Sequence, residues 1–342
     1  MIPFRLSIGV LVLFLTACVS ISSSNQGSSS GARERPPTFD YVPTDIAYSN
    51  HDLPEEDTAQ YQVKRITIPS AGDNGQTNNI VTARYYIGRG SGAKSLLILL
   101  PIWGSYTYPP DVISAGIMRR SRGATNVLVI EGEDFLVNWY DVAAARDLAD
   151  FDRLITQMGS RFHTSVIDTR RYIDWAAQRQ EIDQARIGLI GFSMGALVGS
   201  LVTASDDRLA ASVLVMGAAD LPEVMSYCSG RPGMARESLM NRFNWSTEQY
   251  RNELTARIGF LDPRPFTPSI DPQRVFMIDA YYDDCMPATA RDALWQAMGE
   301  PRRMSFLAGH RTAFLFMTPL AANYMRGEIY QFLEQRLASQ GG

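Results

Sequence analysis

A serine set between two glycines is the feature of this chain best suited to do chemistry. The segment Gly191-Phe192-Ser193-Met194-Gly195 directly follows the largely apolar run 186–190. In a G-x-S-x-G turn the backbone passes so sharply from strand to helix that only small residues fit two positions before and after the serine. The turn exposes the serine hydroxyl, and the amide of Met194 begins the helix, where it can donate to an oxyanion. The pattern therefore predicts a nucleophilic serine.

The neighbouring sequence supplies the elements that such a turn needs. Residues 165–181 repeat apolar side chains at helical spacing, and residues 196–203 are small and apolar enough for a buried helix. Helix, short apolar strand at 187–190, turn and buried helix are expected in that order.

A nucleophilic serine needs a general base, and the chain has only three histidines. His51 lies in a polar N-terminal stretch, and His163 lies just before a predicted helix. His310 follows the strand-like segment 303–307 and precedes the apolar segment 312–317, so we expect it on a loop near the C-terminus. A loop histidine after the last strand can reach a serine turn upstream, so His310 is the predicted base.

The base needs a carboxylate to orient it, placed between serine and histidine if the order is Ser, Asp, His. Asp279 ends the apolar strand 275–278, where its side chain could bond to the loop's own amides. Asp283 lies a few residues farther on, where the chain can bring it toward His310. A carboxylate without this role would form a turn or cap a helix. The order of preference is Asp283, then Asp284, and then Asp220, which follows the strand 212–216.

These motifs resemble the α/β-hydrolase superfamily, and within it the dienelactone hydrolase and related esterase group. G-F-S-M-G at 191–195 resembles the nucleophile elbow, D-D-C-M-P at 283–287 resembles the family's D-x-x-V-P acid motif, and Gly309-His310 resembles its terminal G-H. The resemblance covers about residues 60–337. It implies a serine hydrolase of the carboxylesterase type, EC 3.1.1, with Ser193, Asp283 and His310 as the catalytic triad.

The second oxyanion donor is expected after the strand 95–100. Family members often carry His-Gly there, whereas this chain has Pro101-Ile102. By position the donor would be the backbone amide of Trp103, paired with that of Met194. The alternative is that 101–104 forms only a turn with a packed indole.

Alternating strand and helix patterns predict an α/β fold with a doubly wound, mostly parallel sheet and the site at the carboxyl ends of its strands. The expected helices include 141–158, 165–181 and 320–337. The expected strands cover 62–68, 80–87, 95–100, 126–130, 187–190, 212–216, 275–278 and 304–307.

About sixty residues separate Met216 from Val275, more than a plain crossover requires. The stretch contains a helix that begins with a capping box at 246–249 and runs to Ile258. We interpret 219–272 as a helical cap insertion over the serine, which would favour an apolar substrate portion. The alternative is a surface insertion unrelated to substrate.

The N-terminus carries a second signal. Residues 6–15 form an apolar run too short to span a bilayer, which needs about twenty apolar residues. Leu15-Thr16-Ala17-Cys18 resembles the lipobox of bacterial lipoproteins, whose cysteine carries acyl chains such as palmitate. The resemblance implies a signal peptide at 1–17, lipidated Cys18 with a flexible Ser/Gly-rich tether at 18–40, and the hydrolase domain at 41–342.

This resemblance also implies a location. Val19 rather than Asp follows the cysteine, which in a Gram-negative bacterium points to the periplasmic side of the outer membrane. An ordinary secretory signal cut elsewhere is the alternative.

Composition agrees with a globular enzyme. The chain has 342 residues, 45% of them hydrophobic, enough for a large core in one domain. Its net charge of −4 becomes −5 without Arg5, and no basic stripe is present, so no nucleic-acid partner is expected. No metal-binding motif, P-loop or dinucleotide fingerprint occurs, so we expect neither metal nor cofactor.

Two further cysteines, Cys228 and Cys285, leave two possibilities open. In an oxidising compartment they could form a disulfide that links the insertion to the acid loop. They could also be two buried thiols, and their spacing does not decide between these.

The predicted function is hydrolysis of a small-molecule or lipid-like ester through an acyl-enzyme, at a bacterial membrane to which the enzyme is anchored. The same triad could serve a peptidase or an acyltransferase. A third hypothesis, from another class, is a non-catalytic binding lipoprotein of the cell envelope.

Overall fold

The computed structural model describes residues 20–22, 39–43, 45–75, 78–102, 110–131, 136–317 and 323–338. Their strands form one sheet in the order β1-β10-β9-β8-β7-β5-β6-β4-β3-β2. The strands are β1 (Ser20–Ser22), β2 (Ser49–Asp52), β3 (Tyr61–Pro69), β4 (Ile80–Gly88), β5 (Lys94–Leu100), β6 (Thr125–Ile130), β7 (Ile182–Phe192), β8 (Leu209–Val215), β9 (Val275–Ala280) and β10 (Arg302–Phe306).

The six strands from β6 to β10 in this sheet are parallel, and antiparallel strands flank them on both sides. The central strands β5 and β9 are buried along their whole length, which explains their largely apolar sequences. Strand β5 pairs with β6 along one edge and with β7 along its other edge, so the direction in which the chain adds strands reverses at β5. Ligands of such sheets bind where the strand order reverses in this way, at the carboxyl ends.

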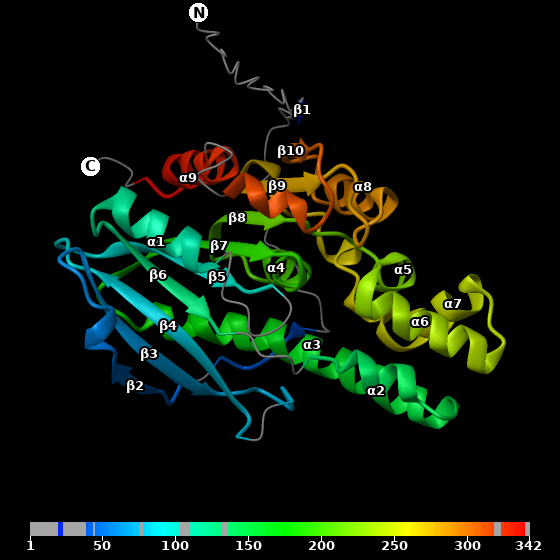
Figure 1. The fold of residues 1–342 in the computed structure, drawn as a ribbon. Coiled ribbons are helices and arrows are strands. Elements are labelled where there is room, and N and C mark those ends of the chain that lie inside the picture. The colour runs from blue at the N-terminus through cyan, green and yellow to red at the C-terminus, as the bar shows by residue number, and fades with distance from the viewer. Residues whose placement is uncertain are drawn as a thin grey trace, which may run out of the picture.

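Helices cover both faces of the sheet (Figure 1). Helices α1 and α9 pack on one face, while α3, α4 and α8 pack on the other. The helices are α1 (Pro110–Ser121), α2 (Trp139–Ala144), α3 (Leu148–Ala177), α4 (Met194–Ser205), α5 (Leu221–Tyr227), α6 (Gly230–Phe243), α7 (Thr247–Ile258), α8 (Ala288–Ala297) and α9 (Tyr324–Arg336). This arrangement confirms the predicted doubly wound, mostly parallel α/β fold.

The prediction of two helices at 141–158 and 165–181 is wrong. The structure has the short α2 and then one continuous helix, α3, of 30 residues. The break lies earlier than expected, where Asp147 caps α3 by accepting a hydrogen bond from the amide of Asp150. Gly159 lies inside α3, and a Cβ there would come within 2.9 Å of Ile258. That glycine therefore serves close packing against α7 rather than a helix end.

Two edge strands lie where no strand was expected. β2 is short, polar and exposed, so its sequence lacks the alternation that marks a strand. β1 lies in the stretch predicted as a flexible tether, yet it pairs antiparallel with β10, with Ser20 opposite Ser305. The remainder of that stretch up to residue 38 lies outside the described residues. Within the described residues, no helix has the length and apolar character needed to cross a membrane.

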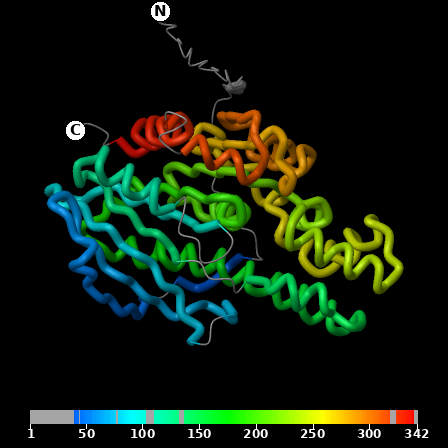
Figure 2. The backbone as a smooth tube through the Cα atoms, in the orientation of Figure 1, coloured from blue at the N-terminus to red at the C-terminus, as the bar shows by residue number. Residues whose placement is uncertain are grey.

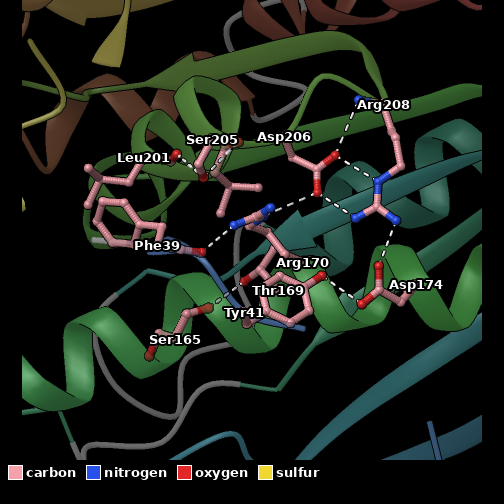
Figure 3. A network of polar contacts seen from close by, with 11 residues as sticks. Phe39, Tyr41, Ser165, Thr169, Arg170, Asp174, Leu201, Ser205, Asp206 and Arg208 are labelled. Carbon is pink, nitrogen blue, oxygen red and sulfur yellow. Dashed lines mark hydrogen bonds and ion pairs between the residues drawn. The ribbon is translucent and has the colours of Figure 1, made fainter. Parts of the chain in front are cut away.

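The folded domain also begins earlier than residue 41, because Phe39 is fully buried. Arg170 of α3 donates to the carbonyl of Phe39 at 2.5 Å and pairs with Asp206 at 3.3 Å, and both charged side chains are 1% exposed. Arg208 joins Asp206 to Asp174, which accepts a hydrogen bond from Tyr41 at 2.6 Å (Figure 3). This network fastens the N-terminal segment to α3 and to the end of α4.

We predict that Asp206→Asn lowers the free energy of unfolding by about 3 kcal/mol, because it leaves the buried Arg170 guanidinium without its carboxylate. Urea denaturation of the purified protein measures this. Asp183→Asn is the matched control, since Asp183 pairs with Arg186 near the surface and should cost less than about 1 kcal/mol. Equal losses in the two variants would contradict the assignment.

The network also predicts a pH dependence. Burial acts to raise the pKa of Asp206, but Arg208 and Arg170 outweigh this effect and hold that pKa below its usual value. The stability it contributes is therefore present above the unfolded pKa of an aspartate and lost as the pH falls through the folded pKa. Wild-type stability should decline over that acidic range more steeply than that of Asp206→Asn.

Candidate active site

The chain turns from β7 into α4 at Ser193, as the sequence predicted. Ser193 has a φ of 51° and a ψ of −112°, a strained conformation for a residue with a side chain. Its amide donates to the carbonyl of Val215 at 2.8 Å, which holds the turn against the end of β8. The serine therefore lies at the carboxyl end of the sheet, beside the place where the strand order reverses.

Backbone contacts explain the two glycines of the motif. A Cβ on Gly191 would lie 2.2 Å from the carbonyl oxygen of Gly195. A Cβ on Gly195 would lie 2.4 Å from the carbonyl oxygen of Pro101 and 2.6 Å from that of Leu100. Because these neighbours are backbone atoms of α4 and of the end of β5, they cannot rotate away as a side chain would.

The structure brings Ser193, His310 and Asp283 into one hydrogen-bonded chain. Ser193 Oγ lies 2.8 Å from His310 Nε2, and His310 Nδ1 lies 2.8 Å from Asp283 Oδ2 and 3.0 Å from Oδ1. A carboxylate can only accept, so Nδ1–H donates to Asp283, and Nε2 of the neutral ring is left to accept from the serine hydroxyl. This arrangement can remove a proton from the serine as its oxygen attacks a carbonyl carbon.

Asp283 is held by its own loop as well as by the histidine. Its side chain is fully buried, and Oδ1 accepts hydrogen bonds from the amides of Cys285 at 2.8 Å and Met286 at 2.7 Å. These donors fix the orientation of the carboxylate, so that Oδ2 faces His310.

The other carboxylates considered as the acid have different partners. Asp284 accepts from Ser229 Oγ at 2.5 Å, and this hydrogen bond lowers the pKa of Asp284. Asp220 caps α5 by accepting from the amide of Glu223 at 3.0 Å and pairs with Arg251 at 2.8 Å. Asp220 therefore caps a helix, as expected of a carboxylate that does not orient the base, whereas Asp284 makes a contact with the distant Ser229 instead of a cap or a turn.

The expectation for Asp279 is wrong. Its side chain does not bond to the loop's amides but forms an ion pair with Arg303 on the adjacent strand β10. The register explains this, because Asp279 lies opposite Ser305, still inside the sheet. Burial raises the pKa of Asp279, and the charge of Arg303 opposes that rise.

The other two histidines lie elsewhere in the fold. His51 is exposed on β2, and His163 of α3 stacks on the ring of Phe39 at 5.2 Å between centroids. Within the described residues, no three histidine, cysteine or acidic side chains form a metal-binding group.

One of the two predicted oxyanion donors is within the described residues. Met194 is the first residue of α4, so its amide belongs to the first turn, where N–H groups have no acceptor within their own helix. Trp103 lies outside the described residues. The close approach of Gly195 to Pro101 shows that the end of β5 adjoins the turn at Ser193.

Helices α5, α6 and α7 lie between β8 and β9, in the stretch interpreted as an insertion. Helix α7 begins with the predicted capping box of Ser246 and Gln249. Figure 1 shows these helices grouped with α2 on the side toward which β7 and β8 point. Ser238 and Arg242 of α6 each donate to the carbonyl of Ala143 at 2.9 Å, and the tube in Figure 2 follows α6 beside α2. No pattern in the sequence indicated that α2 belongs to this helical group.

The cysteine pair left open by the sequence is a disulfide. Cys228 follows α5, and Cys285 lies two residues after Asp283, so the bond joins the insertion to the loop of the predicted acid. The residues Cys228, Ser229 and Cys285 were not predicted as part of the site. The position of Cys285 inside the acid motif 283–287 was the only signal of such a role in the sequence.

Comparison with known proteins agrees with this architecture. Residues 129–229 match the Dienelactone hydrolase family, a segment that contains β7, the turn at Ser193 and α4. The acetyl xylan esterase from Paenibacillus sp. R4 superposes with a TM-score of 0.59 at 15% identity, over 86% of this chain and 90% of that one. Acetyl xylan esterase 1 from Thermoanaerobacterium sp. JW/SL YS485 gives 0.59 at 16% identity, over 86% and 89%. The chain has the α/β-hydrolase fold.

Two sequence relatives match a shorter part of this chain than the solved structures do. Uncharacterized proteins from two strains of Mycobacterium tuberculosis are 25% identical to it over 204 residues. That alignment covers 59% of this chain and 41% of theirs, so the matched segment spans about two-fifths of their length.

We predict that Gly195→Ala lowers the free energy of unfolding by about 3 kcal/mol, because the new methyl group meets the carbonyl oxygens at the end of β5. Gly327→Ala is the matched control. A Cβ there meets nothing within 4 Å in helix α9, so it should raise stability by about 0.5 to 1 kcal/mol. Thermal and urea unfolding of both variants measure the difference, and a Gly195→Ala protein as stable as wild type would refute the contact.

Proposed function

We propose that this protein is a serine hydrolase that cleaves carboxylic esters. The observation that carries the proposal is the chain of hydrogen bonds from Ser193 through His310 to Asp283, with distances of 2.8 Å at both steps. The position of the serine on a strained turn at the carboxyl end of the sheet supports it, as does the match of residues 129–229 to a hydrolase family.

The proposed reaction has two steps. Ser193 Oγ attacks the ester carbonyl carbon while its proton passes to His310 Nε2, and the resulting oxyanion accepts hydrogen bonds from the amides of Met194 and Trp103. The carbon–oxygen bond to the alcohol then breaks, and the alcohol leaves with the proton from His310. Water attacks the acyl-enzyme with His310 again as base, which releases the acid and restores the serine.

The substrate class proposed first is a short-chain carboxylic ester. Two of the structurally similar proteins are acetyl xylan esterases by name, which favours acetyl esters as the first compounds to test. A peptidase or an acyltransferase would use the same three residues and differ only in the leaving group or the acceptor. Aminoacyl amides and an added alcohol acceptor therefore belong in the same substrate panel.

We predict that Ser193→Ala and His310→Ala each lower ester turnover by at least about three orders of magnitude and that Asp283→Asn lowers it by about as much. The measurement is hydrolysis of p-nitrophenyl acetate and butyrate, with circular dichroism to verify folding. Asp220→Asn is the matched control, because asparagine also caps a helix, and it should leave turnover unchanged.

A fluorophosphonate probe tests the nucleophile directly. Mass spectrometry should find the adduct on Ser193 in wild type and on none of the residues of Ser193→Ala. Folded wild-type protein that neither takes the label nor hydrolyses any ester or amide would favour the non-catalytic binding protein instead.

We also propose that the enzyme is anchored to a bacterial envelope by acyl chains on Cys18, at the periplasmic side of the outer membrane if the cell is Gram-negative. The support is the Leu15-Thr16-Ala17-Cys18 motif after a short apolar run. Such an anchor would hold the hydrolase domain at the membrane surface.

We predict that the full chain, expressed in a Gram-negative host, incorporates an alkyne-tagged palmitate and fractionates with membranes. Cys18→Ala should lose the label and leave the outer-membrane fraction, because no thiol remains to be lipidated. The double variant Cys228→Ser/Cys285→Ser is the control for labelling at another cysteine. An unlabelled wild-type protein that begins after a different cleavage site would establish the ordinary secretory signal.

A further inference from the structure

The loop that carries Asp283, residues 281–287, is joined to the helical insertion at two successive residues. Cys285 forms the disulfide with Cys228. Ser229 donates its amide to the carbonyl of Asp284 at 3.0 Å and its hydroxyl to the carboxylate of Asp284 at 2.5 Å. We call Cys228, Ser229, Asp284 and Cys285 the clamp.

The first half of the same loop is held by the sheet instead. The amide of Tyr281 donates to the carbonyl of Phe306 at 2.7 Å, and that of Tyr282 donates to Ala308 at 2.9 Å. Arg291 of α8 donates to the carbonyl of Ala280 at 2.8 Å. These bonds fix the loop up to residue 282 beside the segment that leads to His310. Asp283 therefore lies between residues of the loop that bond to β10 and the segment after it and residues that bond to the insertion.

The clamp acts on the atoms that orient the carboxylate. Cys285, whose sulfur forms the disulfide, also donates its amide to Asp283 Oδ1 at 2.8 Å, next to the donation from Met286. A shift of Cys285 thus moves a hydrogen-bond donor of the carboxylate that faces His310. The Ser229–Asp284 contact lies in the exposed part of the loop, where water competes for both groups. The covalent bond is the link that water cannot replace.

We propose that Cys228, Ser229 and Cys285 are positioning residues that hold Asp283 against His310, so that ester hydrolysis depends on the disulfide. The inference rests on the function proposed above and explains how the carboxylate of Asp283 is held in place. It also means that the enzyme is fully active only where Cys228 and Cys285 are oxidised to the disulfide.

Opening the disulfide should release the loop without detaching the insertion. The amide of Ala219 donates to the carbonyl of Ala290 at 2.9 Å, and Thr289 of α8 donates to the carboxylate of Glu223. Both contacts hold the base of α5 on α8 independently of the clamp. Cys228 is buried and Cys285 is half-buried, so a small reductant has its approach through Cys285.

The test uses a water-soluble phosphine, tris(2-carboxyethyl)phosphine. The phosphine reduces the disulfide by two electrons and becomes the phosphine oxide, and water supplies its oxygen and the two thiol protons. Reduced wild type and the double variant Cys228→Ser/Cys285→Ser should each lose about 10- to 100-fold in kcat, the range for a small misplacement of a catalytic group, with KM changed little. The phosphine should have no further effect on the double variant.

The pH profile separates positioning from mere loss of stability. A displaced Asp283 changes the charge that faces the imidazole, whereas a loss of stability elsewhere does not. The acid limb of kcat/KM should therefore move on reduction and in the double variant. This readout does not depend on how much of the protein is folded.

Matched controls separate the clamp from general stability and from the charge of Asp284. Leu239→Ala removes a buried side chain of α6 away from the clamp, so it should lower Tm and leave the acid limb in place. Asp284 also interacts with the charges of His310 and Arg311. Asp284→Asn keeps an acceptor for Ser229 but removes that charge, and reduction should still move the acid limb in this variant. Ser229→Ala should give a smaller shift than the double variant.

The possible outcomes distinguish the two proposals. If oxidised wild type shows neither ester turnover nor labelling of Ser193, the proposed function fails. If it is active and reduction changes neither kcat nor the acid limb while mass spectrometry shows both thiols free, the clamp alone is refuted. A fall in kcat with an unmoved acid limb, matched by Leu239→Ala, would also refute it, because the disulfide would then act only on stability.

Discussion

The contact between the start of α4 and the end of β5 constrains everything around the candidate site. Gly195 lies so close to the carbonyls of Leu100 and Pro101 that a side chain there would overlap backbone atoms. The helix can approach that strand only because the chain turns at Ser193 with a positive φ. The strain is sustained by the surrounding sheet, including the bond from the Ser193 amide to Val215. The hydroxyl of Ser193 is thereby held at the carboxyl edge of the sheet independently of its hydrogen bond to His310.

The sheet also brings His310 close to Ser193, because neighbouring parallel strands end at the same edge. β9 and β10 pair in parallel, and the backbone bonds from Tyr281 and Tyr282 continue this pairing beyond their ends. The segments that carry Asp283 and His310 are therefore kept side by side although 27 residues separate them in the chain. Local bonding within the acid loop completes the arrangement by turning one carboxylate oxygen toward the ring.

The parts of this site that sequence could predict are those set by local backbone rules. The small residues around Ser193 and the aspartate just past a strand each have a short-range physical reason, and the fold follows from alternating apolar periods. Features set by tertiary contact were missed or left open. Gly159 looks like a helix break but is a packing contact with α7, and the Cys228–Cys285 bond depends on how the insertion folds back.

The three residues of the hydrogen-bonded chain consequently differ in what holds them. Ser193 and His310 follow sheet strands, whereas Asp283 lies between a segment bound to the sheet and one bound to the insertion. Through the disulfide the insertion is joined to the loop of Asp283, whereas the amide of Ser193 is held by the end of β8. A change at the disulfide would alter how well the ring is oriented rather than whether the serine is exposed. At the location proposed for this chain, outside the cytoplasm, a covalent bond is a suitable link at that point, because an oxidising compartment would preserve it.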